Sequence, residues 1–184
     1  MKLSLMKHSL LVISLFASQF IIAQTSEKPD NDSTWTTFKT ENYLIDYPLS
    51  WTIDTSGKMG LELFIFSQPD AVNDKFRENI NVVSSDVEGL GVSLDTFVKV
   101  SQKQIETMAT DCIILESALH KAGDNIFHKL DFTAKQGVFR LRFVQYYFAK
   151  AKRVYTVTLT TELEKFDLYK FDGIKMMDSF IPLQ

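Results

Sequence analysis

Cysteine is almost absent from this chain: its 184 residues contain only Cys112. A single thiol cannot close a disulfide within the chain, so stability must come from a packed core. Bacterial lipoproteins carry a cysteine directly after an apolar leader, and because Cys112 lies far downstream we expect no lipid anchor. We interpret Cys112 as a small buried hydrophobe at the start of a strand, with a reactive or dimerising thiol as the alternative.

Runs of lysine and arginine are also missing. The chain has 20 Lys+Arg against 23 Asp+Glu and a net charge of −3. Loss of Lys2 and Lys7 with an N-terminal leader lowers Lys+Arg to 18 and moves the net charge to −5. A mildly acidic chain of this kind lacks the basic patch of a nucleic-acid binder or of a protein that binds anionic membranes. We expect neither partner class.

Catalytic and cofactor motifs are absent too. The sequence has no Gly-x-Ser-x-Gly, no Walker loop, no cysteine–histidine pair and no paired-carboxylate motif. Asp70, Asn73 and Asp74 share one polar loop, and calcium prefers such oxygen ligands, but their spacing departs from the twelve-residue calcium loop and the required glycine is missing. We therefore predict a non-enzymatic protein without a metal or cofactor.

What is present begins with the first 23 residues. Lys2 and Lys7 precede an apolar stretch from Leu10 to Ile22, and Ala23 is a small residue at the expected cleavage position. This is the layout of a secretory signal peptide, and the apolar stretch is too short for a membrane span. We predict an exported protein, periplasmic or secreted, with residues 1–23 as signal peptide, 24–33 as a disordered leader and 34–184 as one domain.

Extended and helical patterns alternate along that domain. Apolar and β-branched runs bounded by turn residues predict strands at 35–39, 43–47, 51–54, 61–67, 79–85, 112–120, 125–135, 138–149 and 152–161.

Two helices are predicted from residues that recur at steps of three and four. The first spans 93–111, has Ser93 as its N-cap and turns one face inward, made of Leu94, Phe97, Val98, Ser101, Ile105 and Met108. The second begins at a capping box formed by Thr161 and Glu164 and runs to Phe180. Gly173 costs this helix about 1 kcal/mol relative to alanine, which indicates a close approach to the sheet.

Two tight turns set the expected register of the long strands. A turn at Gln136-Gly137 places Asp131 opposite Arg142, an opposite-charge pair. A turn near Lys150-Ala151 places Tyr146 opposite Tyr155. Both faces of the sheet then carry apolar pairs, and a sheet that is apolar on both faces needs cover on both. We predict an α+β fold, a central antiparallel sheet of about six strands flanked by helices on both faces.

Several short motifs resemble the PsbP-like family. Residues 43–48 (Tyr-Leu-Ile-Asp-Tyr-Pro) followed by Trp51 resemble the family's opening strand, residues 93–97 its first helix, residues 155–158 its penultimate strand, and residues 174–180 its closing helix. The resemblance covers nearly all of 34–183. It implies an antiparallel sheet between helices, and it carries over no catalytic residue, because the family shares none.

Three groups of residues are candidates for binding. In the expected register, His128, Gln145 and Thr156, with Thr158 beside them, form a polar row that could orient a ligand or be a satisfied core network. Arg140 and Arg142 share a face and could grip an anion, although an ion pair with Asp131 is the alternative. Four aromatic side chains gather at one end of the sheet, with Arg153 nearby: Phe127, Tyr146, Phe148 and Tyr155. They form either an exposed surface that binds a partner or ordinary core.

The sequence therefore favours a binding module whose partner is another protein or a small apolar ligand. A small-molecule carrier, with its ligand between helix and sheet near the polar row, is the alternative. His120, in an expected turn at 120–124, is interpreted as a solvated side chain.

Overall fold

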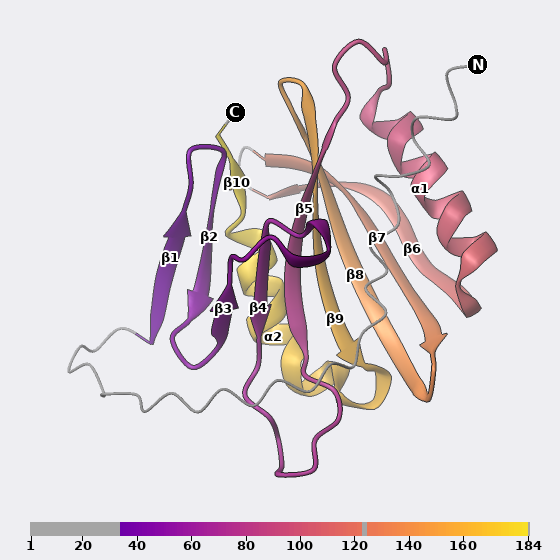
Figure 1. The fold of residues 1–184 in the computed structure, drawn as a ribbon. Helices are drawn as coiled ribbons and strands as arrows, with labels where there is room; N and C mark the ends of the chain where they lie inside the picture. Colours follow the sequence, from indigo (N-terminus) through magenta and orange to yellow (C-terminus); the bar gives the residue numbers. More distant parts are fainter. Residues whose placement is uncertain (1–33, 123–124, 184) are drawn as a thin grey trace.

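A seven-stranded antiparallel sheet dominates the computed structural model, which describes residues 34–122 and 125–183 (Figure 1). The predicted signal peptide and leader lie outside the described residues. The sheet has the order β3-β4-β5-β9-β8-β7-β6, which is one strand more than the six expected. Its strands are β3 (Thr52–Asp54), β4 (Leu63–Phe66), β5 (Asn79–Asp86), β6 (Thr110–Ala122), β7 (Asn125–Gln136), β8 (Phe139–Lys150) and β9 (Arg153–Glu162).

A second, three-stranded sheet joins the two ends of the described chain. It has the order β1-β2-β10, with strands β1 (Trp35–Lys39), β2 (Tyr43–Pro48) and β10 (Ile181–Pro182). The β1–β2 hairpin was predicted from the two aromatic-rich runs. The third strand was not, because two residues are too short to leave a pattern in the sequence. Beyond β10, the backbone N–H of Leu183 donates to the carbonyl of Asn42 over 2.7 Å.

The first helix, α1 (Leu94–Met108), begins as predicted. The hydroxyl of Ser93 accepts a hydrogen bond from the backbone N–H of Thr96 at 3.2 Å. Phe97, Val98, Ser101 and Ile105 are buried. Met108 was expected on the same face and is instead 57% exposed, since it is the last residue of the helix.

The second helix, α2 (Phe166–Asp178), does not start with the predicted capping box. Thr161 is still in β9, and a 3-10 turn, η3 (Leu163–Lys165), separates that strand from α2. Gly173 does lie against the sheet: a Cβ built on it would be 2.6 Å from Cδ2 of Leu159. A second 3-10 turn, η2 (Lys58–Gly60), lies between β3 and β4.

The register of both long hairpins differs from the prediction by two residues. The β7–β8 turn is Gly137-Val138, so Gln136 pairs with Phe139 and Asp131 lies opposite Val144 rather than Arg142. The β8–β9 turn is Ala151-Lys152 rather than Lys150-Ala151, so Lys150 pairs with Arg153. In each hairpin, moving the turn by one residue changes the register of the paired strands by two. The first turn residue has a positive φ in each case, 58° at Gly137 and 50° at Ala151. A shift of two leaves every side chain on its predicted face.

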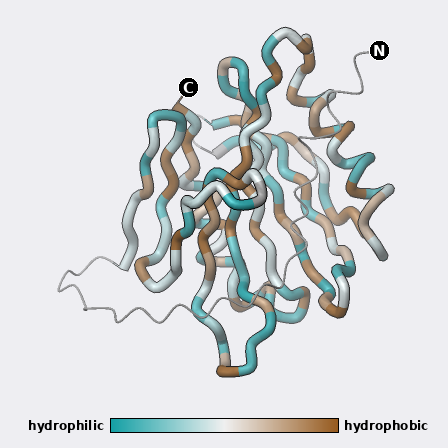
Figure 2. Tube along the Cα trace, in the orientation of Figure 1, coloured by the Kyte–Doolittle hydropathy of each residue, from teal (hydrophilic) through white to brown (hydrophobic). Residues whose placement is uncertain are grey.

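The described core consists of two apolar clusters. The first includes Met176 and Met177 of α2 packed with residues of β2, β4, β5 and β9, and the second includes Phe97, Val98 and Ile105 of α1 packed with residues of β7 and β8. Consecutive residues of β8 alternate between them, with Val144 and Tyr146 in the first and Phe143 and Tyr147 in the second. Figure 2 shows apolar stretches along the strands of the main sheet and residues of both kinds in the connecting loops.

Candidate functional site

The predicted polar row is not assembled as expected. His128 lies opposite Tyr147, and its Nε2 is 3.0 Å from the hydroxyl of Ser117. Gln145 lies opposite Thr158 instead of Thr156, and its side-chain amide donates to Oγ1 of Thr158 at 3.3 Å. The carbonyl oxygen of the same amide accepts from the hydroxyl of Tyr147 at 2.5 Å. Gln145 is therefore part of a closed core network.

The predicted aromatic end of the sheet is buried. Tyr146, Phe148 and Tyr155 are 5%, 3% and 0% exposed. Phe180, which follows α2, covers this end, with its ring centroid 5.1 Å from that of Phe148. The exposed aromatic surface that the sequence suggested is thus absent from the described residues. Arg153, at its edge, donates to the hydroxyl of Ser84 at 2.7 Å.

The two arginines of β8 do not form an anion clamp. Arg142 donates two hydrogen bonds to the carboxylate of Asp131, at 2.9 and 2.8 Å, and its guanidinium lies 3.7 Å from the ring centroid of Phe166. The predicted Asp131–Arg142 ion pair therefore forms between diagonal neighbours, which a two-residue shift in register still allows. Arg140 is exposed.

The remaining histidine, His120, is part of a strand and is engaged by neighbouring side chains. His120 lies in β6 rather than in a turn, stacked on Phe127, with Nε2 2.5 Å from Oε1 of Glu116. The rest of the expected turn, 123–124, lies outside the described residues.

Cys112 is half-buried near the start of β6 and packs against the second cluster. Burial and the nearby charge of Glu106 raise the pKa of its thiol, which disfavours the reactive thiolate.

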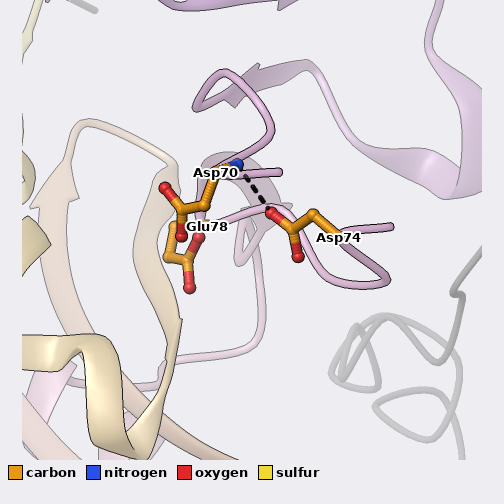
Figure 3. Close-up of side chains that lie close together, drawn as sticks. All are labelled: Asp70, Asp74 and Glu78. Atoms are coloured by element: carbon orange, nitrogen blue, oxygen red, sulfur yellow. Dashed lines mark hydrogen bonds between the residues drawn. The ribbon is translucent and has the colours of Figure 1, made fainter. Parts of the chain in front are cut away.

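An acidic cluster that the sequence did not predict lies between the β4–β5 loop and the start of α2 (Figure 3). One carboxylate oxygen from each of Asp70, Asp74 and Glu78 lies within 4.8 Å of the others. Asp70 is exposed, Asp74 half-buried and Glu78 fully buried. Oδ2 of Asp74 accepts a hydrogen bond from the backbone N–H of Asp70 at 3.0 Å, which holds the loop around the cluster.

Lys165 places its ammonium group among these carboxylates. Its Nζ lies 2.9 Å from Oδ2 of Asp70, 3.7 Å from Oδ1 of Asp74 and 3.9 Å from Oε1 of Glu78. A fourth contact, to Oε2 of Glu162, measures 2.6 Å. The ammonium group is thus hydrogen-bonded to Asp70 and Glu162 and is only within ion-pair distance of the other two.

The ionisation of the cluster follows from these contacts. Hydrogen bonds from Lys165 and then from Tyr169 lower the pKa of Asp70. Burial raises the pKa of Glu78, and hydrogen bonds from backbone N–H groups together with the charge of Lys165 only partly offset that rise. Burial alone would lower the pKa of Lys165, but its bonds to Asp70 and Glu162 raise it overall.

Polar side chains flank Glu78 on both sides within the sheet. The backbone N–H of Ser67 donates to the carbonyl of Glu78, and Thr161 follows Thr160, the partner of Asn79. Ser67 directly after β4, Glu78 directly before β5 and Thr161 near the end of β9 are therefore neighbours in a row at one end of these strands. All three are at most 1% exposed, and within the described part of the chain Oγ of Ser67, Oε2 of Glu78 and Oγ1 of Thr161 have no hydrogen-bond partner.

Glu78 is the residue that sequence reasoning missed. Asp70 and Asp74 were considered together with Asn73 as a calcium loop of known spacing, whereas the third carboxylate comes from the residue directly before β5. Four-residue steps from Asp70 to Asp74 to Glu78 are visible in the sequence, but nothing there shows that a loop folds back on itself.

A groove lies on the outer face of α2. It is open to solvent, has a volume of about 420 Å³, and is lined by Lys170, Phe171, Ile174, Lys175 and Asp178. Two large apolar side chains on this helix are exposed, Leu168 by 72% and Phe171 by 76%. In the described part of the chain, no helix combines the length and apolar character needed to cross a membrane.

Comparison with known proteins yields likeness in structure only. No protein-family profile matches the chain, and no curated protein is detectably similar to it in sequence. Among solved structures, cyanobacterial PsbP (CyanoP) from Synechocystis sp. PCC 6803 superposes with a TM-score of 0.59 at 15% identity, over 86% of this chain and 98% of that one.

Two further bacterial structures are similar. PA94 of Pseudomonas aeruginosa, a protein of unknown function, has a TM-score of 0.58 at 12% identity, over 82% of this chain and 98% of its own. LpqN of Mycobacterium tuberculosis, involved in cell envelope biogenesis, has a TM-score of 0.57 at 12% identity, over 83% of this chain and 92% of its own. Antiparallel sheets, two helices and these superpositions lead to one conclusion: the chain has the PsbP-like fold.

Proposed function

We propose that the protein is an exported, non-enzymatic binding module of the PsbP-like type that contacts another protein through the outer face of α2. Export is supported by the signal-peptide layout of residues 1–23 and by the fold shared with LpqN, a protein of cell envelope biogenesis. A binding role without chemistry fits the candidate residues, because Gln145, Arg142 and His120 are engaged by other side chains of the chain.

The architecture we propose is a sheet with a helix on each face. Neighbouring residues of a strand point to opposite faces. Since Phe143 packs in the cluster that contains α1 residues and Val144 in the one that contains α2 residues, the two helices would cover opposite faces. α2 would then have one side on the sheet and the other free for a partner.

The single observation that carries the proposal is the exposure of Leu168 and Phe171. These side chains are three positions apart on α2 and are therefore neighbours on the helix surface. Phe171 lines the groove with Ile174, and Lys170, Lys175 and Asp178 surround them. An apolar centre within a polar rim is the usual composition of a protein-binding surface. The partner would present an apolar side chain flanked by charged groups.

Affinity capture from the exported fraction tests this proposal, with wild-type protein, Phe171→Ala and Val138→Ala as baits. Val138 is a matched control because it is 85% exposed and apolar but lies in the β7–β8 turn. We expect wild type and V138A to retain the same partner and F171A to lose it. Retention of every partner by F171A would refute the outer face of α2 as the contact surface.

The carrier alternative places a small apolar ligand between α1 and the sheet near His128, Gln145 and Thr156. It has less support, because the amide of Gln145 is bonded to Tyr147 and Thr158 and so has little capacity left for a ligand. Native mass spectrometry distinguishes the two functions: a carrier would show a co-purified small molecule, and a protein-binding module would show the mass of the chain alone.

A further inference from the structure

The row of Ser67, Glu78 and Thr161 is incompletely hydrogen-bonded. Oε1 of Glu78 accepts from the backbone N–H of Glu162 at 3.4 Å. Each side chain is at least 99% buried, and each has one oxygen without a partner among the described residues. A buried polar atom left unpaired costs roughly 1–3 kcal/mol, so each of these oxygens favours a binding partner. The row is next to the acidic cluster, because Glu78 belongs to both. The unpaired, fully buried oxygen of Glu78 therefore points to a ligand of the acidic cluster.

The charge around the row identifies the kind of ligand. Four carboxylates face this region, those of Asp70, Asp74, Glu78 and Glu162. The cations beside them are Lys165 and Arg77, whose Nε donates to the carbonyl of Ser67 at 2.7 Å. Negative charge is therefore in excess, and burial makes an unbalanced carboxylate at Glu78 costly. A cation fits this environment better than a neutral or anionic molecule.

The geometry indicates a divalent cation. Calcium binds oxygen ligands at about 2.3–2.6 Å, so two of its ligands lie at most about 5 Å apart. The carboxylate oxygens of Asp70, Asp74 and Glu78 lie within 4.8 Å of one another and meet this limit. All ligands in reach are oxygens, which suits calcium rather than a metal that prefers nitrogen or sulfur. Magnesium demands a nearly ideal octahedron and fits the irregular set less well.

Lys165 is the cation that the cluster holds in the structure. Its ammonium contacts the same three carboxylates, but it donates no hydrogen bond to Oε2 of Glu78. Its side chain is 28% exposed and contacts Glu162 at 2.6 Å, outside the set of three. The ammonium can thus leave Asp70, Asp74 and Glu78 while it keeps its ion pair with Glu162.

We propose that Asp70, Asp74 and Glu78 form a calcium site in which Lys165 and the metal ion compete. The site joins the β4–β5 loop to Glu78, the residue directly before β5. The earlier expectation of no metal rested on the twelve-residue loop pattern, which this arrangement does not use. The proposal is independent of the contact surface on α2.

Titration calorimetry and thermal unfolding with CaCl₂, after removal of metal with EDTA, test the site. Wild type should bind calcium and unfold at a higher temperature. Glu78→Gln should weaken binding by at least about tenfold, whereas Glu41→Gln, an equal change of charge at an exposed position, should leave binding unchanged. Lys165→Met removes the competing ammonium and should tighten binding by at least about tenfold.

Two results would overturn the proposal. One is the absence of both heat and thermal shift in wild type and K165M alike. The other is a calcium affinity in E78Q equal to that of wild type. If E78Q fails to fold, terbium emission of the wild-type protein replaces it, because Tyr169 donates to Asp70 and its ring is 6.1 Å from that of Trp51. Sensitised emission that CaCl₂ displaces supports the site, and its absence refutes it.

Discussion

Gly173 of α2 lies directly on Leu159 of β9. A Cβ at position 173 would be 2.6 and 2.7 Å from the two Cδ atoms of Leu159, which is 0% exposed. Helix propensity favours alanine over glycine by about 1 kcal/mol. Overpacking a close core contact costs about 1–3 kcal/mol and should outweigh that gain.

We therefore expect Gly173→Ala to lower the free energy of unfolding, measured by urea denaturation. Asp172→Ala, at the preceding and partly exposed position, is the control and should change it by less than about 0.5 kcal/mol. Equal or greater stability of G173A would show that α2 shifts away from the sheet at little cost.

Ala151 has a left-handed backbone, with φ of 50°, in the β8–β9 turn. This conformation costs a residue with a Cβ about 1–2 kcal/mol, whereas glycine adopts it freely. Ala151→Gly removes this strain from the folded state, and it also gives the unfolded chain more conformational entropy, which opposes folding. The first effect is the larger, so we expect the urea midpoint to rise slightly. Ala149→Gly, in the adjoining strand β8, should lower it. A fall in both variants would contradict the assigned turn.

Glu78 should make stability depend on pH in an unusual direction. Burial raises its pKa above the ordinary value of 4.5, so the folded state disfavours the ionised form. Stability from this group is fully present below pH 4.5 and is lost as the pH rises through the folded-state pKa. Relative to Glu78→Gln, wild type should gain stability as the pH falls through this window. Urea titrations in EDTA, at several pH values, measure the difference, and a constant difference would contradict it.

Phe180 is the covering residue of the aromatic end. It is 0% exposed and contacts the rings of Tyr43, Phe148 and Tyr155. Phe180→Ala should cost about 3–5 kcal/mol of unfolding free energy. Phe171→Ala, which removes an exposed ring from the neighbouring helix, should cost less than about 0.5 kcal/mol. Similar losses in both would contradict the assigned burial.

Much of the fold follows from patterns in the sequence. The N-cap at Ser93, the inward face of α1, the long strands and the close approach of Gly173 all depend on local spacing, and local spacing is visible in a sequence. The register was wrong by two residues in both long hairpins. Either position of the turn leaves the same residues on each face, so the apolar pattern could not distinguish them.

The candidate sites could be predicted only in part. The Asp131–Arg142 pair was correct because a long arginine side chain reaches a diagonal neighbour. The exposed aromatic end was wrong because its cover, Phe180, follows the second helix and its path cannot be read from periodicity. Glu78 was missed for a related reason: whether a carboxylate is buried beside two others depends on the path of a polar loop without periodic signal.

The small sheet also bears on how the chain completes its folding. The hydroxyl of Ser179 accepts from the backbone N–H of Asp46, 133 positions earlier, and β10 then pairs with β2. The hairpin formed by the first described strands therefore keeps one edge open until residues 179–183 become available. Closing so long a loop is slow relative to local pairing. A ribosome-stalled or clipped chain that ends at Asp178 would expose that edge, and with it a template for pairing between molecules.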